Sequence, residues 1–151
     1  MKPDSRADAV AVVVLRLAGP EAEVLLLRRS RGVFAGAWTF VMGGVEEGER
    51  ATDAARRELF EETGLKLETL FSAGYLDAFY DPLRDRVVHV PFFVAHVHPG
   101  EAALEDAHDA HRWVSFTEAA ELLEFASQRR ALEEIQRDFV ARKPSSWRTL
   151  R

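Results

Sequence analysis

The sequence predicts an α/β protein, with most of its strands early in the chain and two of its three helices late. Apolar, β-branched runs recur through the first two thirds of the chain, whereas residues 50–63 and 117–142 are rich in helix-forming residues. The chain of 151 residues is 47% hydrophobic and 30% charged, which predicts one folded domain spanning residues 1–151. This composition is too apolar for a disordered chain, and no apolar run approaches the ~20 residues of a membrane span.

Six runs are predicted to be strands: residues 9–17, 23–29, 38–44, 65–76, 86–97 and 111–116. The first two are rich in Val and Leu, and Gly19 and Pro20 between them predict a turn. The third ends at paired glycines. Pro91 lies inside the fifth run, where it indicates an edge strand or a bulge because proline cannot donate a ladder hydrogen bond.

Three helices are predicted. The first spans residues 50–63, and Gly64 stands where a helix stop is expected. The second runs from Thr117, as its N-cap, to Leu123. The third spans residues 128–142, where apolar side chains recur at helical spacing.

The formal net charge of −5 is unevenly distributed. Residues 46–62 hold seven acidic and three basic side chains, so this segment carries −4 of the total. The remainder is nearly neutral, which argues against nucleic acid as the default partner and favours a cation. Because the chain has no cysteine, any metal must bind through carboxylate or imidazole. Residues 142–151 carry basic but no acidic side chains and predict a mobile tail.

The first predicted helix places acidic side chains on its apolar face. Glu58 and Glu62 fall inside the apolar stripe, and Glu61 lies on its border. A carboxylate turned toward a core is costly unless something neutralises it, and a divalent cation held by these three glutamates would do so. The alternative is a set of buried salt bridges to arginines. Arg57 can pair with Glu61 in this way, but it cannot neutralise three acids.

A glycine-rich loop at residues 43–49 precedes this helix. Its glycines allow the backbone to turn tightly and to approach a ligand closely. The loop therefore offers an exposed carbonyl near Gly43 or Gly44, followed by Glu49 at the helix entrance.

Together these residues resemble the signature of the Nudix hydrolases: Gly43, five residues, Glu49, seven residues, and then the run from Arg57 to Leu65. The resemblance covers roughly residues 8–141 and implies an α/β/α sandwich with a mixed sheet. It also implies hydrolysis of a nucleoside diphosphate linked to another group, with Mg²⁺ as the cofactor and Mn²⁺ as a substitute.

The resemblance also implies roles for individual residues. Glu58 and Glu62 resemble the main metal ligands, and Glu61 resembles either a third ligand or the base that activates water. Gly43 would offer its backbone carbonyl. Arg57 resembles the residue that orients the glutamates, and Glu49 resembles a supporting acid.

Outside the signature, the loop at residues 105–109 resembles that of dihydroneopterin triphosphate and deoxynucleoside triphosphate pyrophosphohydrolases. In that pattern an acid directly precedes a histidine, whereas Ala107 precedes His108 here. Glu105 is taken as the additional acid that binds substrate or metal. Arg28, at the end of the second predicted strand, is expected to contact substrate phosphates in preference to Arg29, since alternate side chains on a strand face opposite ways.

We therefore expect a cytoplasmic enzyme that hydrolyses a phosphoanhydride bond in a nucleoside or pterin triphosphate, releasing the monophosphate and pyrophosphate. Two alternatives remain open. The first is a nucleoside diphosphate sugar or dinucleoside polyphosphate hydrolase, and the second is a non-catalytic Nudix module that binds nucleotides and regulates a partner. The expected partner is a small nucleotide or pterin polyphosphate rather than nucleic acid or a membrane, and a homodimer is left open.

Overall fold

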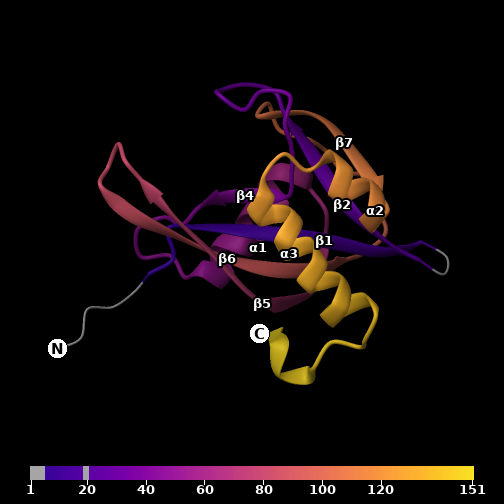
Figure 1. The fold of residues 1–151 in the computed structure, drawn as a ribbon. Helices are drawn as coiled ribbons and strands as arrows, with labels where there is room; N and C mark the ends of the chain where they lie inside the picture. The colour runs from indigo at the N-terminus through magenta and orange to yellow at the C-terminus, as the bar shows by residue number, and fades with distance from the viewer. Residues whose placement is uncertain (1–5, 19–20) are drawn as a thin grey trace.

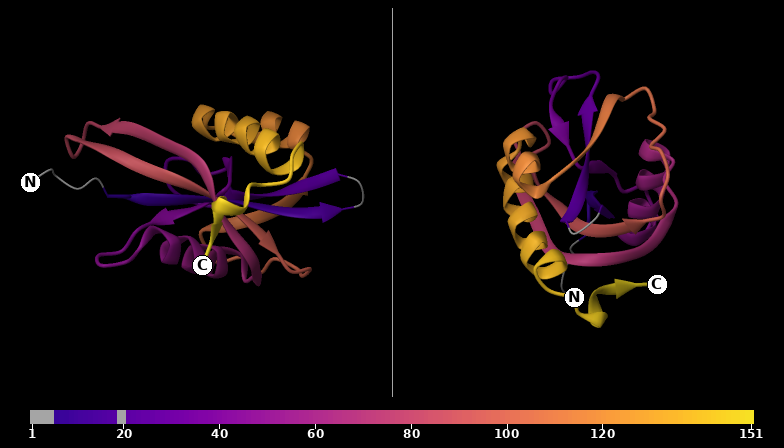
Figure 2. Two further views of the ribbon diagram at one scale, coloured as in Figure 1. Left: turned by 90° about the horizontal axis from the view of Figure 1, so that it is seen from below. Right: turned by 90° about the vertical axis from the view of Figure 1, so that its right-hand side faces the viewer.

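The computed structural model describes residues 6–18 and 21–151, and it contains one mixed β-sheet with helices on both faces (Figures 1 and 2). The strands are β1 Ala9–Ala18, β2 Glu21–Arg29, β3 Trp38–Thr39, β4 Val41–Gly44, β5 Leu67–Asp81, β6 Arg86–Val97, β7 His108–Val114 and β8 Thr149–Leu150. The helices are α1 Ala51–Thr63, α2 Phe116–Leu122 and α3 Ala126–Ile135, followed by the π-helix η1 Gln136–Val140 and the 3₁₀-helix η2 Ser146–Arg148. The turn predicted at Gly19 and Pro20 lies outside the described residues.

The sheet follows the order β3-β2-β1-β6-β5-β8, while β4 pairs with β1 and β7 pairs with β2. Strands β1 and β6 are parallel, and the other pairs of named strands are antiparallel. The predicted mixed sheet is therefore confirmed. In the part of the chain described here, no helix is both long and apolar enough to cross a membrane.

Alternate side chains of β1 separate two buried cores. Val10, Val12 and Val14 belong to the core beneath α1, whereas Ala11 and Val13 belong to the core shared with α2 and α3. A strand places successive side chains on opposite faces, so a continuous apolar run is what a strand covered on both faces requires. Figure 2 shows α1 and α3 on opposite sides of the sheet, as expected for an α/β/α sandwich.

Several boundaries differ from the prediction. The strand expected at residues 38–44 is divided at Phe40, because Trp38–Thr39 pairs with β2 and Val41–Gly44 pairs with β1. Helix α2 is capped by Ser115 rather than Thr117, since the Ser115 hydroxyl accepts a hydrogen bond from the backbone N–H of Glu118 at 3.1 Å. Pro91 was predicted to mark either an edge strand or a bulge, and it lies opposite a bulge in β5.

The segment expected to be a mobile basic tail is instead attached to the sheet. β8 pairs with Leu70 and Phe71 of β5. The Arg148 guanidinium donates to the carbonyl of Ala73 at 2.6 Å and to the Asp138 carboxylate at 3.2 Å. The contacts with β5, which is distant in sequence, hold in place a segment whose composition alone indicates mobility.

Candidate active site

Helix α1 supports most of the predicted site. It begins after Arg50, which has extended backbone geometry, and ends at Gly64, whose φ of 67° suits glycine. Ala54, Ala55 and Leu59 are buried against the sheet and hold the helix in place. The predicted helix and its stop are confirmed, and its glutamates are fixed relative to β4.

Glu58 lies directly against the glycine strand β4. A Cβ atom at Gly43 would overlap the Glu58 carboxylate, so any side chain at this position would displace it. Burial raises the pKa of Glu58, and hydrogen bonding from Arg57 partly opposes this shift. The glycine therefore creates space for a partly desolvated carboxylate at the edge of the sheet.

Arg57 connects the glycine loop to the acidic face of α1. Its Nε and Nη2 atoms donate to the two carboxylate oxygens of Glu49, at 2.8 and 2.9 Å. Its Nη1 atom donates to Glu58 at 2.8 Å and to Glu61 at 3.1 Å, and Nη2 also reaches the carbonyl of Gly44 at 2.9 Å. A rigid planar guanidinium can satisfy such a spread of acceptors, which a lysine ammonium cannot.

Glu49 is the acid most strongly stabilised in its charged form. The Arg57 guanidinium, together with the backbone N–H of Glu46, lowers the pKa of Glu49 to about 2. Its contact with Glu49 in turn raises the pKa of Arg57. Glu49 therefore holds Arg57 in position. The positive charge of the Arg57 guanidinium is divided between Glu49 and the other acids that it contacts.

Glu62 is the most deeply buried acid of the helix, with 5% of its surface exposed. Its Oε2 atom is buried and has no hydrogen-bond partner among the described residues. Burial, followed by repulsion from Glu58, raises the pKa of Glu62 to about 9. The carboxylate form of such a group requires a neutralising partner, and Arg57 already contacts four other acids.

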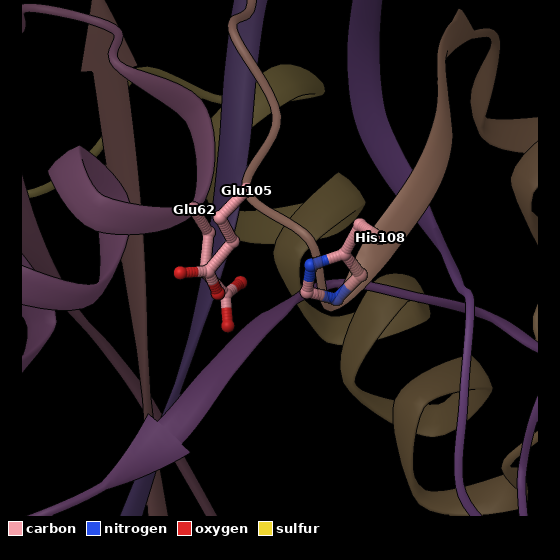
Figure 3. A group of neighbouring side chains, drawn as sticks. All are labelled: Glu62, Glu105 and His108. Carbon is pink, nitrogen blue, oxygen red and sulfur yellow. The ribbon is translucent and has the colours of Figure 1, made fainter.

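Two side chains from other elements, Glu105 and His108, lie close to the buried Glu62 carboxylate, as Figure 3 shows. One ligand atom from each of Glu62, Glu105 and His108 lies within 4.8 Å of the other two. Glu62 comes from α1, Glu105 from the loop after β6, and His108 from the start of β7. Burial lowers the pKa of His108, which favours its neutral, metal-binding form, and its Nδ1 atom has no partner in the described part of the chain.

The donor set fits a divalent cation. Two carboxylates and one imidazole offer oxygen and nitrogen ligands, and two of the three residues have a buried polar atom without a partner. Glu58 adds a third carboxylate on the same helix, next to Gly43. A bound cation would add to the charge compensation that Arg57 and Arg29 supply only in part.

The two arginines at the end of β2 point to different faces of the sheet. Arg28, which was expected to face the site, donates instead to the Asp109 carboxylate at 2.7 Å. Arg29 is in register with His108, and its positive charge acts on both Glu62 and His108. Its Nε atom is buried without a hydrogen-bond partner among residues 6–18 and 21–151. Side chains do alternate along β2, so only one of the two arginines faces the site, but the sequence did not show which face of β2 that is.

Glu61 and the 105–109 loop complete the arrangement. Glu61 has 47% of its side chain exposed and lies at the rim, in contact with Arg57. Glu105, which is itself exposed, joins the buried Glu62 and His108, whereas Asp109 pairs with Arg28. The contribution of His108 to this cluster was not predicted, although its spacing of three residues from Glu105 was visible in the sequence.

The comparisons with known proteins agree with this geometry. The NUDIX domain family matches residues 6–140. The chain belongs to the Nudix hydrolase family. Nudix membership confirms the resemblance found in the motif and is consistent with the acidic cluster on α1.

Three curated relatives of this Nudix chain show how far its similarity extends. It is 39% identical to a Myxococcus xanthus protein named octanoyltransferase, over 82% of this chain but 35% of that protein. It is 42% identical to the mouse oxidized purine nucleoside triphosphate hydrolase, over 50% of this chain and 48% of that protein. It is 32% identical to the mouse asymmetrical bis(5'-nucleosyl)-tetraphosphatase, over 74% of this chain and 77% of that protein. The chain thus spans about a third to a half of the first two relatives.

Solved structures share the fold. The Caenorhabditis elegans Ap4A hydrolase in a binary complex has a TM-score of 0.75 at 24% identity, covering 89% of this chain and 98% of that one. The Escherichia coli dihydroneopterin triphosphate pyrophosphohydrolase has a TM-score of 0.67 at 25% identity, covering 86% of this chain and 97% of that one. The α/β Nudix fold is therefore established.

Proposed function

We propose that this Nudix protein is a Mg²⁺-dependent pyrophosphohydrolase that converts a nucleoside or pterin triphosphate into the monophosphate and pyrophosphate. The observation that carries the proposal is the buried Glu62 carboxylate, which lies beside Glu105 and His108 and has an oxygen without a hydrogen-bond partner. Mn²⁺ is the expected substitute. Similarity to a purine nucleoside triphosphate hydrolase and to a dihydroneopterin triphosphate pyrophosphohydrolase supports this substrate class.

In this proposal Glu58 and Glu62 are the principal metal ligands, and the backbone carbonyl of Gly43 contributes as well. Glu105 and His108 add ligand atoms from the opposite wall. When bound, Mg²⁺ would spread the negative charge of the phosphates and increase the acidity of a nearby water. The raised pKa of Glu62 applies to the metal-free protein, since a cation favours the carboxylate form.

Glu61 is the proposed base, and its alternative role is that of a third metal ligand. It lies at the exposed rim of the site, where its carboxylate can accept a proton from the attacking water. The water oxygen forms a new bond to phosphorus, the phosphoanhydride P–O bond breaks, and the bonding electrons leave with the departing phosphate group. Arg57 orients Glu58 and Glu61, and Glu49 holds Arg57.

For the substrate phosphates, the geometry favours Arg29 over Arg28. Arg29 lies beside Glu62 and His108 and has a buried Nε atom without a partner among the described residues, whereas Arg28 already pairs with Asp109. A guanidinium with unused donors can bind phosphate oxygens in a bidentate manner.

Two other functions remain as alternatives. Similarity to the mouse tetraphosphatase favours a dinucleoside polyphosphate, and a nucleoside diphosphate sugar belongs to the same reaction class. A non-catalytic nucleotide-binding module is the alternative of another class, and retention of Glu58, Glu61 and Glu62 counts against it. We further propose that residues 1–151 act as a single domain in the cytoplasm.

The test is a substrate panel with Mg²⁺ or Mn²⁺. It contains nucleoside triphosphates, dihydroneopterin triphosphate, a nucleoside diphosphate sugar and a dinucleoside polyphosphate, and monophosphate and pyrophosphate are measured separately. Release of both products from a triphosphate is expected. Turnover of no member with either metal would contradict the enzymatic proposal.

The matched variants are Glu62→Gln and Glu121→Gln. The first removes a buried carboxylate of the cluster, while the second changes an exposed acid on α2. Glu62→Gln should abolish most turnover, and Glu121→Gln should leave it unchanged. Equal activities in the two variants would refute the proposed ligand set.

A further inference from the structure

The sheet divides beyond Leu15. The pairing of β1 with β6 ends at Leu15 and His96, whereas β1 continues its pairing with β2 as far as Ala18. β6 in turn remains paired with β5 as far as Val97. The end of the β1–β2 hairpin beyond Leu15 and Val24 therefore extends past β6 and β7, and Figure 1 shows it projecting from the sheet.

A cavity of about 980 Å³ occupies this division. Its lining includes the apolar side chains of Leu17, Val97 and Trp113 together with residues 139–144. The cavity shares no residue with the acidic site. Gly43 pairs with Val10, five residues before Leu15, so at ~3.3 Å per strand residue the two sites are roughly 17 Å apart along β1.

The charges around this cavity differ from those of the acidic site. Arg16 lies 4.2 Å above the Trp113 ring and is held there by Glu23 at 3.0 Å. Arg142 and Lys143 are exposed at the wall, and neither takes part in an ion pair with any residue that the structure describes. The lining also contains Glu68 and Glu101, so the cavity offers both cationic and anionic side chains beside its aromatic surface.

We propose that this cavity is a second binding site, for an organic phosphate that carries a planar ring, such as a nucleoside monophosphate. Its volume is that of a small-molecule site. The stacked Arg16 and Trp113 offer a planar surface for the ring, and Arg142 and Lys143 offer donors for the phosphate. Glu68 and Glu101 on the wall can accept hydrogen bonds from hydroxyl or amino groups of the same ligand.

The test separates this site from the acidic site by excluding divalent cations. Binding of AMP is measured by isothermal titration calorimetry in EDTA, with the full chain and with its Glu58→Gln, Glu62→Gln double variant. Both proteins should bind AMP with similar affinity. Adenosine, which lacks the phosphate, and inorganic phosphate, which lacks the ring, should each bind more weakly than AMP.

Charge reversal then tests the position of the ligand. Arg142→Glu with Lys143→Glu should weaken AMP binding about tenfold or more, because two attractive charges become repulsive. Arg130→Glu, which reverses an exposed cation on α3, is the matched control and should have no such effect. Trp113→Leu, which keeps an apolar side chain but removes the ring, should also weaken AMP binding. Its cooperative thermal unfolding would show that the variant is folded.

The proposal is overturned if AMP does not bind in EDTA. It is also overturned if the Glu58, Glu62 double variant loses the binding, or if the charge-reversed variant binds as tightly as the Arg130→Glu control. None of these results would bear on hydrolysis, which is measured separately with Mg²⁺.

Discussion

The buried Glu62 carboxyl group predicts an unusual stability effect in the metal-free protein. Its pKa is about 9 in the folded state and 4.5 when exposed in the unfolded chain. The folded protein therefore keeps a proton that the unfolded chain releases above pH 4.5. The resulting contribution to stability is fully present below pH 4.5 and is lost as the pH rises from 4.5 toward 9.

Glutamine has the shape of the protonated side chain but does not titrate. Since one pKa unit corresponds to about 1.4 kcal/mol, the stability lost by the parent protein between pH 5 and pH 8 is up to about 4 kcal/mol. Glu62→Gln should not show this loss. The difference in free energy of unfolding between the variant and the parent should therefore shift in favour of the variant by a few kcal/mol between pH 5 and pH 8.

Thermal and urea denaturation in EDTA at both pH values would measure this effect. A change of about 1 kcal/mol shifts the Tm of a domain of this size by roughly 2–4 °C, so the effect is readily detected. Adding Mg²⁺ at pH 8 should offset much of this difference, because binding of the cation at about 100 times its Kd stabilises the parent by about 2.7 kcal/mol, whereas the variant lacks one of the proposed metal ligands.

Glu61→Gln is the matched control. This side chain lies next to Glu62 in sequence but is half exposed, and a surface ion pair contributes about 1 kcal/mol or less. Its stability difference from the parent should therefore be small at both pH values. The reasoning is refuted if Glu62→Gln in EDTA shows the same stability difference from the parent at pH 5 and at pH 8.

Three further predictions concern glycines and arginines. Gly43→Ala should abolish both Mg²⁺-induced stabilisation and turnover, whereas Gly44→Ala should be tolerated because the nearest atom to its new Cβ is 4.0 Å away; melting curves with and without Mg²⁺ would distinguish the two. Arg29→Ala should raise KM for the substrate about tenfold or more through loss of phosphate contacts, and an equal effect from Arg28→Ala would contradict the assigned faces of β2. Arg148→Ala should lower the free energy of unfolding by about 1–3 kcal/mol without changing kcat, as urea denaturation and steady-state kinetics would show.

The sequence was most informative where local chemistry is decisive. Helix α1 and its stop at Gly64 follow from helix-forming residues and a glycine at the left-handed position. The burial of Glu62 was visible as a charged residue on an apolar stripe, because a helix places residues three and four apart on one face. The motif from Gly43 to Leu65 is also local in sequence, and its residues and spacing were sufficient to indicate the family that the comparisons established.

Tertiary structure decided the contacts between distant segments. Glu105 and His108 reach Glu62 only because the loop after β6 and the start of β7 lie beside α1. The pairing partners of β2 determine that Arg29, and not Arg28, faces that group. The tail likewise owes its order to an edge of β5 that is more than seventy residues away in the chain. Residue spacing along one element is encoded locally, whereas the side of a strand that meets a helix depends on packing of the whole sheet.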